Sequence, residues 1–295
     1  MNKPLKRVAI AFSRKKKICE DTIVNLIAVL KSCDCRIFAA DVLRDYFPAG
    51  GKAFVSFLPI EDMYRQADVA IVLGGDGSIL SAAHYASRFN VPILGVNFGK
   101  IGYMTELNAN EFQLIPTIVQ GNYRLDSRMM LDAELLDAND NVRMKRSFLN
   151  DCALTNGPVA RLLNFNIYLN GKQLNAVRSD GLVVSTPTGS TAYSMSAGGP
   201  ILDPGVAGIV LTPICPYSLS SRPLVIRDDS VIEIRDITCR ENQVYLTTDG
   251  KRSLEVSRGD RIRITRSAYQ THLIKTSDDG FVEVLYRKLS DHDEK

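Results

Sequence analysis

Residues 68–78 decide the fold, and they read DVAIVLGGDGS. Residues 68–73 are apolar except for Asp68, which predicts a strand that is buried on both faces, as in a parallel sheet. Three glycines among the next four residues allow the backbone to turn sharply and to approach a ligand closely. Residues 78–89 then predict a helix. A buried strand, a tight turn and a helix in this order favour an open α/β layer fold.

The segments around this stretch continue the alternation of strands and helices. Residues 21–30 have helical apolar spacing, and short buried strands are predicted at residues 7–12, 36–40 and 91–96. We therefore predict that residues 1–122 form an α/β domain with an open, Rossmann-like parallel sheet.

Beyond residue 123 the pattern changes to short strand-like runs, at 131–136, 165–169, 182–184, 231–235 and 261–265. The dipeptides Asn170-Gly171 and Asp249-Gly250 are typical of tight hairpins, because both central residues need a positive φ. Residues 123–275 are therefore predicted to be a β-rich second domain. Residues 276–295 form a C-terminal segment, which we expect to pack back on the first domain.

The composition is that of an ordinary globular protein. Hydrophobic residues make up 45% and charged residues 23% of the chain, which excludes a disordered, collagen-like or coiled-coil protein. A net charge of +3 gives no global field for nucleic acid or membrane. No apolar run approaches the roughly 18 residues of a membrane span, and the N-terminus lacks an apolar signal segment. The six cysteines show no metal-ligand spacing, so we expect reduced thiols, no resident metal site and a cytoplasmic location.

The turn after the decisive strand is the first candidate site. Asp76 lies at its tip, outside the carboxyl end of a strand, where open α/β sheets bind their ligands. The amides at the start of the following helix suit a phosphate, which makes Gly74, Gly75 and Ser78 candidate ATP-binding residues. The alternative is a plain strand-to-helix turn whose aspartate caps the helix.

A second glycine-containing loop, residues 95–102 (GVNFGKIG), follows the next strand and should reach the same edge of the sheet. Its glycines lack the spacing of a dinucleotide-binding fingerprint. A flexible loop at this place still suits a ribose or a phosphate, with Asn97 and Gly99 as candidates, and a simple turn is the alternative. The basic run 14–17 (RKKK) suits a triphosphate or is a solvated charged face.

The most informative stretch is STPTGSTAYS at residues 185–194, which follows the apolar residues 182–184. Seven of these ten side chains carry hydroxyl groups, which hydrogen-bond phosphates and riboses without charge. Just before it, Asp180 offers a carboxylate to a ribose or a base, and Arg178 offers a fixed cation. A flexible linker is the alternative, but next to a buried strand an ordered polar cradle is favoured.

Three segments in this order resemble the NAD kinase family. They are the turn 74–77, the run from Asp180 through TPTGSTAY (186–193) to SAGGP (196–200), and the segment 212–224. The resemblance implies an N-terminal α/β domain, a C-terminal β-sandwich and an active site between them. It implies transfer of the γ-phosphoryl group of ATP to the 2′-hydroxyl of the adenosine ribose of NAD, giving NADP, with Mg²⁺ or another divalent cation accompanying ATP. It also implies a homo-oligomer, commonly a tetramer in bacteria.

The resemblance also assigns roles to single residues. By match to the family pattern, Asp76 is the expected proton acceptor. The residues expected to bind NAD are Asp76, Gly77, Asn150, Asp151, Arg161, Arg178, Asp180, Thr188, Thr191, Ala192, Tyr193, Ser194, Ser196 and Lys251.

The chain departs from the family pattern at a few of these places. Asp151 is one methylene shorter than the usual glutamate, which puts its reach to the substrate in question. Arg161 stands where some relatives have histidine. Lys251 replaces a frequent glutamine, and Tyr217 a frequent histidine. We expect these departures to alter affinity, or the preference between NAD and NADH, without changing the reaction.

Two other functions remain open from the sequence. A diacylglycerol-type lipid kinase shares the Gly-Gly-Asp-Gly turn, but this chain lacks the Gly-Thr-Gly-Asn-Asp element usual there. A non-catalytic NAD(P)-binding sensor would explain the shortened Asp151 by lost activity. The sequence contains no Walker A loop, serine-hydrolase elbow, protein-kinase signature or His-Glu-x-x-His pair.

Overall fold

The computed structural model describes residues 2–14, 18–99, 102–157, 162–240, 243–277 and 280–293. The chain divides into two compact units: unit 1 contains residues 1–127 and 271–295, and unit 2 contains residues 128–270. Two long strands, β7 (Arg124–Leu136) and β18 (Arg261–Lys275), carry the chain out of unit 1 and back into it.

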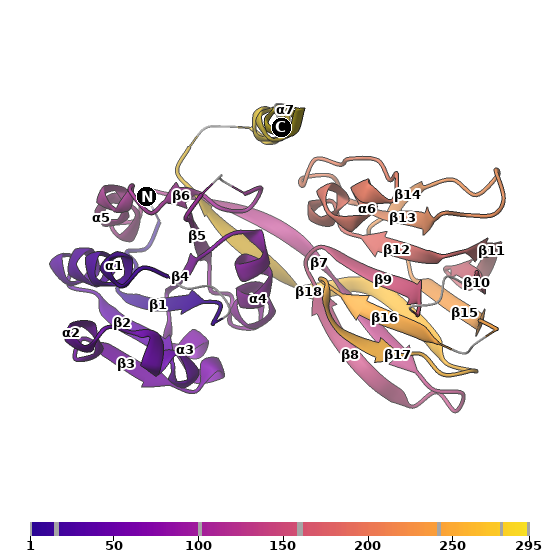
Figure 1. Ribbon diagram of the computed structural model, residues 1–295, viewed down its shortest axis with the longest axis horizontal. Coiled ribbons are helices and arrows are strands. Elements are labelled where there is room, and N and C mark those ends of the chain that lie inside the picture. The colour runs from indigo at the N-terminus through magenta and orange to yellow at the C-terminus, as the bar shows by residue number, and fades with distance from the viewer. Residues whose placement is uncertain are drawn as a thin grey trace. The chain divides into compact units, whose positions relative to one another are not determined.

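Unit 1 alternates strands and helices along the chain (Figure 1). Its elements are β1 (Arg7–Phe12), α1 (Glu20–Ser32), β2 (Arg36–Ala40), α2 (Ala49–Lys52), β3 (Val55–Leu58), α3 (Ile60–Gln66), β4 (Val69–Leu73), α4 (Asp76–Ala86), β5 (Ile93–Asn97), β6 (Leu107–Asn108), α5 (Ile115–Val119) and α7 (Phe281–Asp293). Short 3-10 turns lie at Asp41–Tyr46, Ser87–Phe89 and Phe112–Leu114.

The sheet of unit 1 has the strand order β3-β2-β1-β4-β5, and every neighbouring pair is parallel. All residues of β4 are buried, as expected for a strand covered on both faces. Helix α3 packs against β1, β2 and β3, whereas α4 packs against β4 and β5. Because the strand order reverses between β1 and β4, the carboxyl ends of these two strands mark the switch point where such sheets bind ligands.

The end of β18 extends the same sheet. Leu273 of β18 pairs in parallel with Ile93 of β5. Just beyond it, the carboxylate of Glu106 accepts hydrogen bonds from the backbone amides of Thr276 (2.5 Å) and Ser277 (2.8 Å). The ammonium of Lys275 lies 3.0 Å from the same carboxylate, and this charge together with the amides lowers the pKa of Glu106 against the effect of burial. Backbone hydrogen bonds and an ion pair with Glu106 therefore hold the end of the last strand, β18, in unit 1.

Unit 2 consists almost entirely of strands. Its elements, besides β7 and β18, are β8 (Val142–Phe148), β9 (Asp151–Asn156), β10 (Leu163–Leu169), β11 (Lys172–Ser179), β12 (Gly181–Ser185), the 3-10 turn η4 (Thr188–Thr191), α6 (Tyr193–Ser196), β13 (Gly208–Ile214), β14 (Leu224–Arg227), β15 (Ile232–Thr238), β16 (Val244–Thr248) and β17 (Lys251–Glu255).

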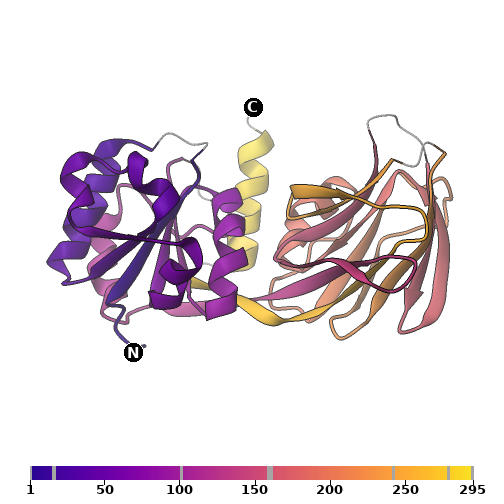
Figure 2. The ribbon, with the colours of Figure 1, turned by 90° about the horizontal axis from the view of Figure 1, so that it is seen from below.

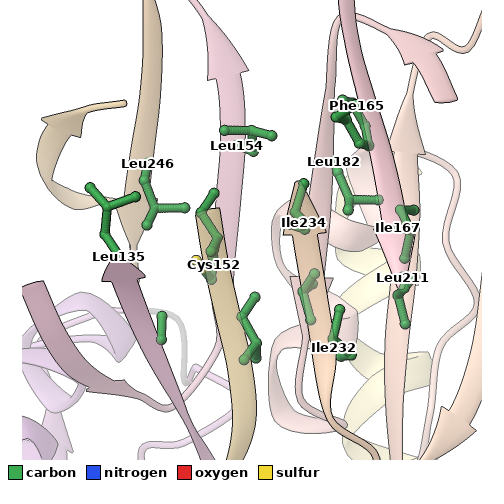
Figure 3. Packing of buried hydrophobic residues seen from close by; sticks show 14 of the residues in the cluster. Leu135, Cys152, Leu154, Phe165, Ile167, Leu182, Leu211, Ile232, Ile234 and Leu246 are labelled. Atoms are coloured by element: carbon green, nitrogen blue, oxygen red, sulfur yellow. The ribbon is translucent and has the colours of Figure 1, made fainter. Parts of the chain in front are cut away.

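These strands form two sheets that share one core. One sheet has the order β14-β13-β12-β9-β16-β17 and is antiparallel throughout. The other contains β11, β10, β15 and β18, with β7 and β8 beyond β18. Leu154 and Leu182 of the first sheet join Phe165 and Ile234 of the second in one buried apolar cluster. Figure 2 shows the strands of unit 2 in two layers, and Figure 3 shows these side chains between them, so unit 2 is a β-sandwich.

The predicted fold class, an α/β domain with a parallel sheet followed by an all-β sandwich, is confirmed. Both predicted hairpins are confirmed as well. Asn170-Gly171 joins β10 to β11, Asp249-Gly250 joins β16 to β17, and all four residues have a positive φ. None of the helices in the described part of the chain has the length and apolar character needed to cross a lipid bilayer.

Candidate active site

The glycine-rich turn of unit 1 connects β4 to α4 at the switch point. Gly74 has a φ of +138°, which favours glycine, and its amide donates to the carbonyl of Val96 at 2.7 Å. A Cβ on Gly74 would lie 3.0 Å from Cβ of Ser78. The turn is therefore packed against both the end of β5 and the first turn of α4, and a side chain on Gly74 would disturb it.

Asp76 is the first residue of α4, and the loop after β5 holds its carboxylate. The amide of Tyr103 donates to Oδ2 at 2.9 Å, and the amide of Met104 donates to Oδ1 at 3.1 Å. The helix-cap alternative is wrong: the N-cap residue is Gly75, and no side-chain cap hydrogen bond is made at this helix. The carboxylate is therefore oriented by the neighbouring loop and not by its own helix.

The remaining predicted residues of this edge lie around the same turn. Gly75 precedes α4, Ser78 is buried in its first turn, and Asn97 ends β5, where its Oδ1 accepts the amide of Phe98 at 2.9 Å. A Cβ built on Gly77 or Gly99 would meet nothing within 4 Å. Packing therefore does not require glycine at these two positions. Lys100, Ile101 and the basic residues 15–17 lie outside the described residues.

In unit 2, Asn150 and Asp151 lie at the start of β9. Asp151 is opposite Ser185 of β12, and only 6% of its surface is exposed. The amide of Tyr193 donates to its carboxylate. Burial, and to a smaller degree the negative charge of Asp249, raise the pKa of Asp151 to about 7 against this hydrogen bond. A carboxyl group with such a pKa is able to donate or accept a hydrogen bond near neutral pH.

Asp249 is a neighbour of Asn150 and Asp151 that the sequence pattern did not predict. The sequence marks it only as half of a hairpin dipeptide, yet its carboxylate accepts the backbone amides of Leu149 (3.0 Å), Asn150 (2.7 Å) and Asp151 (3.3 Å). Burial raises its pKa, although the three amides and the charge of Lys251 act in the opposite direction. The amides of Tyr103 and Met104 were missed too, because backbone donors leave no mark in a sequence.

The hydroxyl-rich stretch 185–194 is ordered, so the linker alternative is wrong. The hydroxyl of Thr186 donates to the carbonyl of Leu149 at 2.5 Å, and that of Ser190 to the carbonyl of Pro187 at 2.6 Å. Ser194 is fully buried, and its hydroxyl lies 2.9 Å from that of Thr212. These hydroxyl groups hold the stretch on its own sheet, whereas the sequence analysis expected them to face a ligand.

Residues near the end of the stretch are more accessible. Tyr193 is 42% exposed, and Thr191, Ala192 and Ser196 are not fully buried. Thr188 is buried and accepts a hydrogen bond from Nη1 of Arg128 at 3.3 Å. The accessible surface of the stretch is therefore limited to its last turn.

Arg178 and Asp180 flank the stretch from the end of β11. The guanidinium of Arg178 lies 5.1 Å from the ring centroid of Tyr217, whose amide donates to the Arg178 carbonyl. The amide of Asp180 donates to the carbonyl of Ile214 at 2.9 Å. Lys251 is the first residue of β17, and desolvation lowers its pKa against the effect of Asp249. Arg161 lies outside the described residues.

The structure thus gathers the predicted residues into two sets, one in each unit. The set in unit 1 contains a fixed carboxylate beside a glycine-rich turn and a helix start, which suits proton transfer next to a phosphate. The set in unit 2 contains neutral hydrogen-bonding groups, a buried acid and an arginine, which suits a polar, ring-containing ligand. Among the described residues, no group of three or more His, Cys, Asp and Glu side chains is placed to hold a metal ion.

Family models match both halves of the chain. The ATP-NAD kinase C-terminal domain matches residues 149–276, and the ATP-NAD kinase N-terminal domain matches residues 55–123. An NAD kinase of Carboxydothermus hydrogenoformans is 40% identical over 245 residues, covering 83% of this chain and 87% of the relative. An NAD kinase of Citrifermentans bemidjiense is 41% identical over 229 residues, covering 77% of this chain and 79% of the relative.

Solved structures match nearly the whole chain. A crystal structure of yeast NADH kinase complexed with NADH gives a TM-score of 0.87 at 25% identity, covering 97% of this chain and 88% of that one. An NAD kinase from Archaeoglobus fulgidus in complex with ATP gives a TM-score of 0.73 at 21% identity, covering 96% and 98% of the two chains, and supports the fold alone.

Proposed function

Because the chain belongs to the NAD kinase family, we propose that Asp76 is the group that removes the proton from the reacting hydroxyl of NAD. The activity is that of the family: the γ-phosphoryl group of ATP moves to the 2′-hydroxyl of the adenosine ribose of NAD, and NADP is formed. A lipid kinase is not favoured, since the relatives described above are NAD or NADH kinases.

One observation carries the proposal for Asp76. Its two carboxylate oxygens each accept a backbone amide of the neighbouring loop, from Tyr103 and from Met104, at the switch point of the sheet. Each oxygen keeps a lone pair for a substrate hydroxyl. A carboxylate fixed in this way can accept the ribose proton as the bond to phosphorus forms, and such general-base help supplies roughly 10²–10⁴-fold in rate. The larger contribution is expected from orientation of the reacting groups, worth roughly 7–11 kcal/mol.

The phosphates of ATP are assigned to the residues around the same turn, which are Gly74, Gly75, Ser78, Asn97 and Gly99. The support is local: Gly74, Gly75 and Ser78 form the turn and the start of the eleven-residue helix α4, and Asn97 ends the neighbouring strand β5. A helix start offers amide donors and a positive dipole end, both of which favour phosphate.

We assign NAD to Gly77 and Asp76 in unit 1 and to the polar set in unit 2. That set comprises Asn150, Asp151, Arg161, Arg178, Asp180, Thr188, Thr191, Ala192, Tyr193, Ser194, Ser196 and Lys251. The hydroxyl of Ser194 is bonded to Thr212, so its part is assigned to the backbone. Asp151, half protonated near neutral pH, suits a ribose hydroxyl or an amide group, to which it can offer either a donor or an acceptor.

A divalent cation, preferably Mg²⁺, is expected to bind together with ATP. Mg²⁺ usually keeps several waters and is held by substrate phosphates with one or two carboxylates. The described residues do not form a cage of three acidic, histidine or cysteine ligands, so they do not fit a resident metal. Proton transfer and positioning of the substrate are therefore assigned to the side chains of the protein.

A homo-oligomer, and specifically a tetramer, is proposed for the assembled enzyme. The support is an apolar edge of unit 2. Tyr217 is 73% and Leu219 is 85% exposed, and the edge strand β14 exposes Leu224 and Val225. Exposed apolar edge strands are usually covered in native proteins. We propose that a second copy of the chain covers the apolar edge at β14. We also propose that the enzyme works in the cytoplasm, where its six free cysteines remain reduced. Light scattering of the purified protein after size-exclusion chromatography measures the number of subunits.

The test of function uses purified protein with ATP, Mg²⁺ and NAD. An NADP-specific dehydrogenase reports product, and calorimetry in parallel reports NAD binding. NADP formation supports the kinase, whereas NAD binding without product supports the sensor. Replacing ATP with polyphosphate, and NAD with NADH, then defines the donor and the acceptor.

A further inference from the structure

Asp249 connects two hairpin strands to the start of β9. The strands β9, β16 and β17 are neighbours in one sheet (Figure 1), and Asp249 is in the turn between the last two. Its φ of +49° places it in the left-handed region. From there its side chain reaches back to β9 and accepts three consecutive amides, those of residues 149, 150 and 151.

The link between the two segments is reciprocal. While the Asp249 carboxylate accepts the amides of Asn150 and Asp151, the Asp249 amide donates to the Asp151 carbonyl at 2.9 Å. The start of β9 is thus held by four hydrogen bonds to one residue. Asn150 is further enclosed by the hydroxyl-rich stretch: a Cβ on Gly189 would lie 2.7 Å from Cα of Asn150. Small movements of Asp249 would therefore move both residues assigned to NAD.

The charges around Asp151 also depend on Asp249. Three other titratable groups bear on Asp151 and Asp249: Tyr193 on α6 and Cys152 on β9 lie around Asp151, and Lys251 on β17 acts on Asp249. Asp249 is stabilised as an anion by its amides and by Lys251, whereas the Asp151 carboxylate receives one amide, from Tyr193. The pKa of Asp151, about 7, leaves this carboxyl group partly protonated near neutral pH.

We propose that Asp249 is a positioning residue for NAD, which sets the place of Asn150 and Asp151 and keeps the Asp151 carboxyl group available as a hydrogen-bond donor. The proposal rests on the assignment of these two residues to NAD given above. Asp249 touches no reacting atom in this scheme. Its removal should therefore weaken NAD binding far more than it changes turnover or ATP binding.

The test compares Asp249→Asn with Asp140→Asn. Both aspartates sit in hairpin turns with a positive φ, and asparagine tolerates that conformation, but Asp140 pairs with Arg261 and is not bonded to the start of β9. In Asp249→Asn we expect the KM for NAD to rise about tenfold or more, with kcat and the KM for ATP within about threefold. Asp140→Asn should leave all three unchanged.

A pH profile separates positioning from a general loss of structure. Loss of the Asp249 charge lowers the pKa of Asp151, so the inflection of kcat/KM for NAD should move to lower pH in Asp249→Asn and disappear in Asp151→Asn. Asp249→Ser replaces Asp249→Asn if circular dichroism or thermal melting shows that the latter does not fold. An unchanged KM for NAD together with an unmoved inflection overturns the proposal.

Failure of this proposal is distinguishable from failure of the proposed function. If the wild-type protein forms no NADP, the function is wrong. If the wild type forms NADP and Asp151→Ala raises the KM for NAD while the folded Asp249 variant does not, only the role of Asp249 is wrong. If Asn150→Ala and Asp151→Ala both leave the KM for NAD unchanged, Asp249 has no substrate contact to position, and the proposal is rejected as well.

Discussion

Gly102 leaves the space that the carboxyl group of Asp76 occupies. A Cβ built on Gly102 would stand 2.6 Å from Cγ of Asp76 and overlap the carboxylate oxygens. Gly102→Ala should therefore push the carboxylate or its loop aside. We expect kcat for NADP formation to fall about 10²-fold, since a misplacement of about 1 Å has this cost, and stability to fall by about 1–3 kcal/mol. Steady-state kinetics and thermal melting measure the two effects, and an unchanged kcat contradicts the expectation.

Gly77→Ala is the matched control for Gly102→Ala, because its added methyl group overlaps no protein atom. Gly77 lies in the first turn of α4, where a Cβ meets no atom within 4 Å and alanine favours the helix by about 1 kcal/mol. The melting temperature should therefore stay the same or rise. Because the added methyl group enters space assigned to the substrate, we expect kcat/KM to fall about tenfold or more. Equal activity in variant and wild type would remove Gly77 from the site.

Asp76→Asn tests the proton acceptor itself. The amide keeps the size of the side chain but is a very poor base, so turnover should fall about 10²–10⁴-fold while NAD binding stays within several-fold. Single-turnover kinetics and calorimetric titration with NAD measure the two quantities. Near-normal turnover excludes Asp76 from proton transfer.

The buried Asp151 should make stability depend on pH. Its folded pKa of about 7 lies above the ordinary value of 3.8, so the folded state holds more protons between these values and stability falls as pH rises through them. Asp151→Asn removes this loss. Between pH 5 and pH 8 the variant should therefore gain up to about 3 kcal/mol of stability relative to wild type, and its melting temperature should rise accordingly.

Circular dichroism melts at several pH values provide that measurement. The comparison must be between the two proteins, because carboxylates with a lowered pKa, such as Asp68 and Glu233, make both of them more stable as pH rises from acid. If the difference in melting temperature between Asp151→Asn and wild type does not change with pH, the prediction is wrong.

Leu182→Ala tests the core of the sandwich. Leu182 is fully buried between the two sheets, and its truncation should cost about 2–5 kcal/mol. Leu174→Ala, at an exposed position of the edge strand β11, should change the stability of the protomer by about 0.5 kcal/mol or less. Denaturant unfolding of both variants gives the comparison, and equal losses would place the core elsewhere.

Much of the fold follows from local sequence pattern. The strands predicted at 7–12 and 36–40 match β1 and β2 residue for residue, and the predicted strand at 68–73 is one residue longer than β4. These strands are continuous apolar runs, and such runs are buried whatever their partners are. The helix predicted for 78–89 begins two residues earlier, at Asp76, and continues as a 3-10 turn after Ala86.

Other elements depend on partners that are distant in the sequence. The strand β9 was not predicted, because its start, Asp151-Cys152, has no local pattern and its neighbours β12 and β16 lie far along the chain. The composition of the stretch 185–194 predicted its order, but the hydroxyl groups of Thr186, Ser190 and Ser194 have partners within the protein. Composition does not distinguish a hydroxyl that faces a ligand from one that bonds its own backbone.

The candidate site shows the same division. Asp76 was predicted from the sequence because a strand, a glycine turn and a helix fix its place along the chain. Its two amide donors, Tyr103 and Met104, were not, and neither was the reach of Asp249 to the start of β9. Those contacts arise only when separate loops meet in three dimensions.

The pairing of Leu273 with Ile93 has a consequence for synthesis on the ribosome. Residues 128–270, which form unit 2, are all translated before the strand end that extends the sheet of unit 1. During translation the inserted sandwich can mature early. The nascent α/β layer must wait until the final segment emerges from the exit tunnel, because until then β5 lacks its partner at Ile93 and has only β6 at its far end. Messages truncated shortly before codon 271 should therefore yield products whose N-terminal half is sensitive to protease while the sandwich resists it.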